Sequence, residues 1–166
     1  MARGSLRVEQ GEPEQERRAE RPIDLVHLAK QCLGDEHLEY EVLRLYDEGG
    51  ILANGQRVGA YFETKLATLA DHPLVGEVRA RGLLAGVELV ADKASREKFP
   101  RSVKLAEHLF ARGYANGVIF RAFADDIIGL APPLCCSDED IDVLIERFTK
   151  TLDDVLAIPD VRAALV

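Results

Sequence analysis

Two stretches of the chain decide its fold, and the first reads Leu74-Val-Gly-Glu-Val-Arg-Ala-Arg-Gly-Leu-Leu-Ala-Gly-Val-Glu-Leu-Val90. The second reads Gly117-Val-Ile-Phe-Arg-Ala-Phe-Ala-Asp-Asp-Ile-Ile-Gly-Leu-Ala-Pro-Pro-Leu134. The first stretch pairs a charged run, 74–80, with an apolar run, 83–90, around a glycine turn, and the second holds two apolar runs around an acidic turn. Both patterns are typical of paired strands. We therefore expect a hairpin of strands 74–80 and 83–90, and a second pair of strands, 118–123 and 127–130.

The region before the first hairpin has helical spacing. Apolar residues three and four apart predict a helix over 56–70. Asp71-His72-Pro73 ends this helix, because proline supplies no amide donor and disfavours the helical state of the residue before it. Gly49-Gly50 and Asn54-Gly55 are expected to form turns upstream of it.

Two further helices are predicted from their caps. Ser102 is the expected N-cap of a helix that stops at Gly113. Ser137-Asp-Glu-Asp140 is a second capping arrangement, and the apolar stripe that follows it runs to Leu156. Four strands with two or three helices on one face give an α+β fold, with a small and mostly antiparallel sheet.

The N-terminal part of the chain differs from the rest. Residues 1–21 are mostly charged and polar, and we expect them to be disordered because they bury too little apolar surface. Helical spacing on either side of Gly34-Asp35 predicts two short helices within 22–48. The expected organisation is a disordered segment 1–21, a helical segment 22–48, a sheet-containing domain 49–158 and a tail 159–166.

Composition excludes several functions. The chain has 166 residues and a formal net charge of −8, so it lacks the basic field on which nucleic-acid binding depends. Its apolar runs fall far short of the roughly 20 residues that span a bilayer. The start of the chain has no apolar signal core, and we expect a cytoplasmic protein with neither nucleic acid nor membrane as partner.

The three cysteines, Cys32, Cys135 and Cys136, give an odd count. They form no Cys-x-x-Cys pair and have no histidine at zinc-ligand spacing. We expect three reduced, partly buried thiols and no metal site.

The two strand stretches, in this order and followed by a long amphipathic helix, resemble the C-terminal small domain of class III pyridoxal-phosphate-dependent aminotransferases, the group that includes the omega-amino acid transaminases. The resemblance runs from about Leu43 to Ala157. It implies the small domain of a fold-type I enzyme, with pyridoxal 5'-phosphate as the family's cofactor.

The resemblance also implies a role for Arg121, which in related enzymes pairs with the substrate's carboxylate. A guanidinium suits that role, since it offers two parallel donors and stays charged at physiological pH. The alternative is that Arg121 caps a strand end or pairs with Asp125 or Asp126. The family usually has Gly-Asp-Thr where this chain has Ala124-Asp125-Asp126, and the extra carboxylate could compete for the arginine.

No residue of the chain is predicted to be catalytic or to bind the cofactor covalently. Lys65, Lys93, Lys98 and Lys104 lie on amphipathic helices or a charged loop, whereas a lysine that forms a Schiff base needs a buried pocket. Gly82 and Gly86 lack the spacing of a phosphate-binding loop. His72 and His108 have no nucleophile placed by the sequence, so surface or helix-end roles are expected for them.

A second resemblance lies near the N-terminus. Residues 22–45 are similar to the opening of some bacterial histidine-phosphotransfer (Hpt) proteins, and His27 and Lys30 give a His-x-x-Lys spacing. Gln31 stands where a glycine normally follows, and the supporting four-helix bundle is missing.

Two functions follow as hypotheses. The chain is part of a class III aminotransferase, contributes the substrate-carboxylate side and is inactive alone, with a lysine-bearing large domain or a second copy as partner. Alternatively, it is a non-catalytic binding or regulatory module, including a phosphorelay remnant.

Overall fold

The computed structural model describes residues 25–123 and 126–166, so the expectation for residues 1–21 lies outside the described part. The chain divides into two compact units, 1–48 and 49–166. The first contains helices α2 (Leu25–Gln31) and α3 (Glu36–Asp47). Asp35 caps α3 by accepting hydrogen bonds from the amides of His37 and Leu38, which confirms the helix break predicted at Gly34-Asp35.

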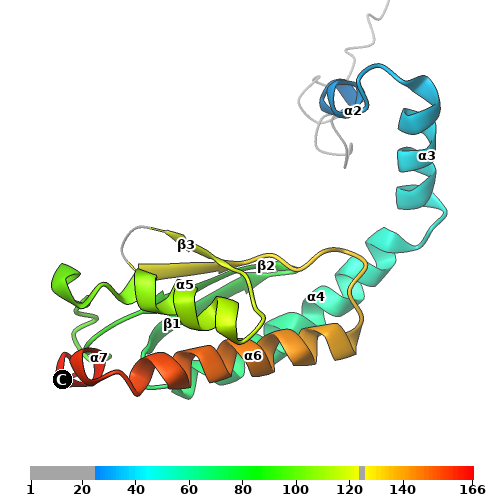
Figure 1. The fold of residues 1–166 in the computed structure, drawn as a ribbon. Helices are drawn as coiled ribbons and strands as arrows, with labels where there is room; N and C mark the ends of the chain where they lie inside the picture. Colours follow the sequence, from blue (N-terminus) through cyan, green and yellow to red (C-terminus); the bar gives the residue numbers. More distant parts are fainter. Residues whose placement is uncertain (1–24, 124–125) are drawn as a thin grey trace, which may run out of the picture. The chain divides into compact units, whose positions relative to one another are not determined.

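The second unit is built around one sheet. Its four strands are all antiparallel and lie in the order β1-β2-β4-β3 (Figure 1). This confirms the predicted α+β class. The elements are α4 (Ile51–Ala67), the short 3-10 turn η1 (Thr68–Asp71), β1 (Val75–Arg81), β2 (Leu84–Leu89), the 3-10 turn η2 (Arg101–Val103), α5 (Leu105–Ala115), β3 (Arg121–Phe123), β4 (Ile127–Leu130), α6 (Asp138–Leu156) and α7 (Pro159–Ala163).

Strand register explains how the sheet separates a core face from an open face. Val87 of β2 pairs with Val78 of β1 and with Ile128 of β4, which in turn pairs with Ala122 of β3. Paired residues project to the same face, so these four side chains form one apolar row. Their neighbours along each strand project to the opposite face.

Helices cover the apolar row. α4, α5 and α6 lie on one side of the sheet (Figure 1), and their apolar residues enter a single core. Phe62 of α4 and Phe148 of α6 are fully buried, and Phe148 meets Phe120 edge to face with ring centroids 5.5 Å apart. In this unit, the described residues place no helix on the opposite side of the sheet.

The predicted cap of the last helix is confirmed. The Ser137 hydroxyl accepts a hydrogen bond from the Asp140 amide, and the Asp140 carboxylate accepts one from the Ser137 amide, a reciprocal capping box. Three acidic residues in the first turn also favour the positive end of the helix.

Polar side chains fix α4 against α6. Arg57 donates to both carboxylate oxygens of Asp138 at 2.7 and 2.8 Å. One turn further on, Asp142 accepts from Tyr61 at 2.9 Å and from Lys65 at 2.8 Å. These contacts follow one another along the two helices, so they set which turn of α4 faces which turn of α6.

Two glycines predicted to end or break helices lie inside them instead. The predicted Asn54-Gly55 turn is wrong, because both residues belong to α4 and a β-carbon on Gly55 would lie 2.5 Å from the side chain of Leu134. The helix predicted to stop at Gly113 continues to Ala115. A β-carbon there would lie 2.6 Å from the ring of Phe120, so this glycine serves close packing.

The predicted cap at Ser102 is also wrong. Ser102 lies within η2, and Lys104, in the left-handed conformation with φ 53°, precedes α5 without a side-chain cap. The strand predicted over 118–123 begins only at Arg121. In the stretch 159–166, expected as a tail, α7 forms and Val161 is fully buried.

Within the described ranges, the structure contains no helix that is both long and apolar enough to cross a membrane.

Candidate functional site

The open face of the sheet carries two arginines in one register row. Arg79 of β1 pairs with Gly86 of β2, Gly86 pairs with Gly129 of β4, and Gly129 pairs with Arg121 of β3. Register partners share a face, so the two arginines stand on the outer strands with two glycines between them. With strands about 4.8 Å apart, roughly 14 Å separates the Cα atoms of the two arginines.

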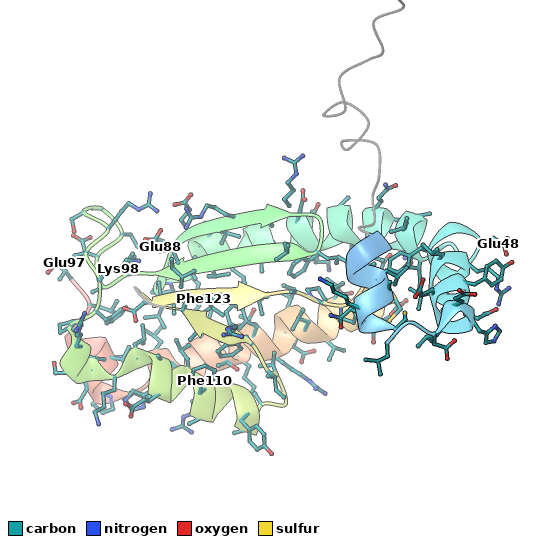
Figure 2. The ribbon with its side chains drawn as sticks, turned by 90° about the horizontal axis from the view of Figure 1, so that it is seen from above. Glu48, Glu88, Glu97, Lys98, Phe110 and Phe123 are labelled. Atoms are coloured by element: carbon teal, nitrogen blue, oxygen red, sulfur yellow. The ribbon has the colours of Figure 1, made fainter. Side chains whose placement is uncertain are left out.

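Arg121 lies against an aromatic ring. Its guanidinium carbon lies over the ring of Phe123, 5.8 Å from the centroid. The two residues are two apart on β3 and therefore project to the same face. Arg121 is exposed and Phe123 is 52% exposed, so the pair is open to a ligand or a partner. Figure 2 looks down on the sheet and labels Phe123 over its strands.

The ring of Phe123 occupies the space left by a glycine. A β-carbon built on Gly129 would lie 2.6 Å from Cε2 of Phe123. An aromatic side chain packed diagonally over a strand glycine covers backbone that would otherwise be bare. Gly129 therefore determines where the ring lies, and the ring borders the guanidinium of Arg121.

The predicted acidic competitors of Arg121 are placed only in part. Asp125 lies outside the described residues. Asp126 is half-buried, has a φ of 57° and lines a cavity on the side of Lys98 and Lys104.

Charged side chains form a network on the open face, over β1 and β2. Arg96 donates to Glu77 and, at 2.6 Å, to Glu88, and Lys98 donates to the other oxygen of Glu88 at 2.6 Å. Figure 2 shows Glu88 and Lys98 together at this end. The Lys98 hydrogen bond is the main cause that lowers the pKa of Glu88, with Arg96 contributing in the same direction. The network connects the 92–99 loop to two strands and pairs each of the two glutamates with a positive charge.

A cavity of about 380 Å³ lies between this loop and the start of α5. It was not predicted from the sequence, because Asp126 meets the segment 98–107 only in the fold. Its lining combines three basic, two acidic and several apolar residues, namely Lys98, Phe99, Pro100, Arg101, Lys104, Leu105, Ala106, Glu107 and Asp126.

The lysines around the cavity do not make a site for pyridoxal phosphate. The ammonium of Lys98 donates hydrogen bonds to Glu88 and to the carbonyl of Leu89, and the side chain of Lys104 is 64% exposed. A lysine that binds an aldehyde needs a neutral amine in a shaped, sheltered pocket.

The other lysines do not fit the cofactor either. Lys93 donates to the carbonyls of Ala70 and His72, and the pKa of Lys65 is raised by its hydrogen bond to Asp142. Lys30 is exposed, and Lys150 pairs with Asp154 at 2.7 Å. All six lysines of the chain fall within the described ranges, and none is placed to hold the cofactor.

Among the remaining candidates, His72 has a specific structural place at the end of η1. Its Nδ1 accepts a hydrogen bond from the Leu74 amide at 3.2 Å, and its Nε2 lies 3.3 Å from Asp153 on α6. The side chain is 9% exposed, and burial is the main cause that lowers its pKa. His72 therefore lies at the end of η1, between the start of β1 and α6.

The glycines and cysteines take structural positions. Gly82 forms the β1–β2 turn with a φ of 58°, and Gly86 lies within β2. All three cysteines are free thiols: Cys32 is buried, Cys136 is half-buried and Cys135 is exposed. Lys30 of the His-x-x-Lys spacing is exposed on α2, and a phosphotransfer role for His27 stays a prediction.

The sheet with helices on one face is an α+β small domain, and solved transaminases share it. An (S)-enantioselective omega-transaminase from Thermomicrobium roseum matches with a TM-score of 0.68 and 41% identity over 72% of this chain and 26% of that one. A structure described as a transaminase with L-alanine matches with a TM-score of 0.68 and 38% identity, over 72% and 28% of the two chains.

The chain belongs to the class III aminotransferase family, whose model matches residues 37–152. A diaminobutyrate–2-oxoglutarate transaminase from Halomonas elongata is 35% identical over 68% of this chain. A putrescine–pyruvate aminotransferase from Pseudomonas aeruginosa is 41% identical over 58% of it. The chain spans about a quarter of the length of these curated relatives, 24% and 21% respectively. Members of this family depend on pyridoxal phosphate.

Proposed function

We propose that this chain forms the substrate-carboxylate side of a pyridoxal-phosphate-dependent class III aminotransferase. Such an enzyme moves an amino group from an amine or an omega-amino acid to a 2-oxo acid. The observation that supports this role is the position of Arg121, exposed on the open face of the sheet in a chain of this family. Its guanidinium can give a carboxylate two parallel charge-assisted hydrogen bonds.

The proposed partner is a large domain that carries the cofactor lysine. Pyridoxal phosphate would supply the electron sink for the chemistry, and the residues of this chain would bind and orient the substrate. The six lysines are exposed or engaged in the contacts described above, which supports the proposal that the chain has no aminotransferase activity by itself. We place this function in the cytoplasm, where the three free thiols would stay reduced.

Covalent labelling tests the proposed inactivity. The purified chain is incubated with pyridoxal phosphate, reduced with borohydride and digested for mass spectrometry. We expect no lysine to be labelled above the level seen with an exposed lysine of an unrelated protein. Selective labelling of Lys98, which lines the cavity, would overturn this part of the proposal.

Complementation tests the role of Arg121. The chain is mixed with the lysine-bearing remainder of a class III relative, such as the T. roseum transaminase without its matching segment. We expect turnover only when both parts are present. Arg121→Met should lower kcat/KM for a carboxylate-bearing acceptor by about ten- to a hundredfold, the loss expected for a hydrogen bond between charged groups.

A matched control is available on the same register row. Arg79→Met removes an arginine from the same face of the sheet, roughly 14 Å away, and should leave kcat/KM nearly unchanged. An acceptor aldehyde without a carboxylate should react equally well with the Arg121 variant. Equal losses for both arginines, or for both acceptors, would contradict the proposal.

A binding or regulatory module is the second candidate function. Apolar side chains exposed along α5 and the segment after it favour it, namely Phe110, Tyr114 and Ile119 at 49%, 80% and 83% exposure. Exposed apolar surface of this kind often marks an interaction site, including self-association. Sedimentation that shows a monomer, together with no binding of a hydrophobic dye, would argue against this candidate.

A further inference from the structure

We infer that Phe123 is a positioning residue for Arg121: its ring, seated over Gly129, holds the guanidinium in place for a carboxylate. The inference rests on the proposed role of Arg121 and assigns to Phe123 a part in the affinity for the carboxylate. It involves three residues on two paired strands, β3 and β4.

The exposure of Phe123 gives the first reason. The ring is 52% exposed and lies on the face of the sheet opposite the helices, so it contributes little to the core. Its neighbours on that face are the glycine beneath it, the arginine beside it and its register partner Ile127. Figure 2 shows Phe123 on the sheet, apart from Phe110 on α5.

The geometry gives the second reason. A cation within about 6 Å of a ring centroid and over its face is attracted by the electrons of the ring. The guanidinium carbon of Arg121 lies over the ring at 5.8 Å. A guanidinium that lies against a ring keeps hydrogen-bond donors at its edge, so the contact restrains the side chain without using up those donors.

Gly129 is the third element, because it sets the position of the ring. The ring atom Cε2 lies 2.6 Å from the place where a β-carbon of residue 129 would stand. Alanine at this position would therefore displace the ring while keeping it in the protein. The phenyl group is a flexible neighbour, so we expect the displacement to cost little stability.

Arg79 provides the internal comparison. It occupies the same row on the opposite outer strand, and its described contact is with Glu77, whose Oε1 lies 3.9 Å from its Nε. The two arginines thus share strand geometry and exposure, and differ in their neighbour.

The first test observes the side chain of Arg121 by NMR in the isolated, isotope-labelled chain. Its Nε–Hε signal, assigned with Arg121→Lys, should be shifted upfield by the ring current and should show restricted motion. Phe123→Leu and Gly129→Ala should both remove the shift and increase the motion, whereas Phe123→Tyr should keep both properties. The signal of Arg79 should be unchanged in all three variants.

An Arg121 signal that Phe123→Leu leaves unmoved would overturn the inference. An upfield shift of the Arg121 signal that persists in Gly129→Ala would also overturn it. Amide spectra of the variants distinguish these outcomes from misfolding, since the signals of core residues such as Val87 should stay in place.

The second test measures kinetics in the complemented enzyme. Phe123→Leu should raise KM for a carboxylate-bearing acceptor about two- to fivefold with kcat unchanged, the factor that corresponds to an exposed cation–π contact. Phe123→Tyr should restore the original KM. An unchanged KM in Phe123→Leu would overturn the positioning role.

The two tests separate this inference from the proposed function. If complementation gives no turnover, the proposed function fails, and the NMR result still decides whether the ring holds the arginine. If turnover depends on Arg121 and the ring current is absent, the proposed function stands and the inference fails.

Discussion

The two faces of the sheet use the same four strands for different purposes. On the core face, the row of Val78, Val87, Ile128 and Ala122 packs under helices. On the open face, side chains are held by charge and by one aromatic ring. Because burial decides what a substitution costs, stability should depend mainly on the core face and ligand binding on the open face.

The largest effect should come from removing a ring on the core side. Phe148→Ala should lower the free energy of unfolding by about 3–5 kcal/mol, because the side chain is fully buried against Phe120. Urea denaturation of the chain measures this. Val143→Ala, on the same helix but 43% exposed, is the matched control and should cost less than about 1 kcal/mol. Equal costs would contradict the assignment of the core.

A smaller effect is expected from the charge network on the open face. Glu88→Gln should cost about 1–2 kcal/mol near neutral pH, since it weakens hydrogen bonds from Lys98 and Arg96. The folded state lowers the pKa of Glu88 below its ordinary value of 4.5. Its contribution is therefore present above pH 4.5 and is lost as the pH falls through the lowered pKa.

Acid titration of stability checks this expectation. The unfolding free energy should fall more steeply below pH 4.5 in the original chain than in Glu88→Gln. Glu107→Gln is the control, since Glu107 is 72% exposed in its side chain and lies 3.8 Å from Lys104. A slope that is the same for all three proteins would show that Glu88 is not held by the network.

His72 should give a pH-dependent change in stability at higher pH than Glu88 does. Its folded pKa lies below the ordinary 6.5 because of burial, with Asp153 opposing and Lys93 adding to the shift. Between the lowered pKa and 6.5 the unfolded chain binds a proton that the folded chain excludes, so stability should rise with pH and level off above 6.5. His72→Asn should flatten this rise, and His108→Gln on α5 should not. If the unfolding free energy of His72→Asn rises with pH as in the original chain, another group causes the rise.

The smallest effect on stability is expected for Phe123, which compares a phenylalanine on the open face with Phe148 in the core. Phe123→Leu should change the unfolding free energy by less than about 1 kcal/mol, although Phe148→Ala on the other side costs several. Thermal or urea denaturation measures both. A loss above 2 kcal/mol for Phe123→Leu would show that its ring belongs to the folded core, in conflict with a role centred on Arg121.

Local patterns allowed much of this fold to be predicted. The hairpin of 74–80 and 83–90 and the Ser137–Asp140 cap depend on neighbours in sequence, and both were confirmed. Gly55 and Gly113 were misjudged because their positions are set by packing against residues outside their own helices, the side chains of Leu134 and Phe120. A glycine that breaks a helix and one that admits a neighbour look the same in sequence.

The candidate site was predicted less completely, for the same reason. Arg121 could be singled out through the family resemblance, and its role stays a proposal. Phe123 was missed, since its relation to Gly129 is a diagonal across two strands. The available signal was an aromatic residue two positions after the arginine, with a glycine in the following strand. The cavity gave no such signal, because Asp126 and the segment 98–107 meet only in the fold.

Asn54 connects two segments that lie far apart in the sequence. Its amide group donates to the carbonyls of Leu134 and Cys136, at 2.7 and 3.0 Å, in the connection between β4 and α6. These hydrogen bonds join the first turn of α4 to the connection that follows β4, the strand paired with the one that carries Arg121. Removing the Asn54 amide would leave two backbone carbonyls of that connection without this donor.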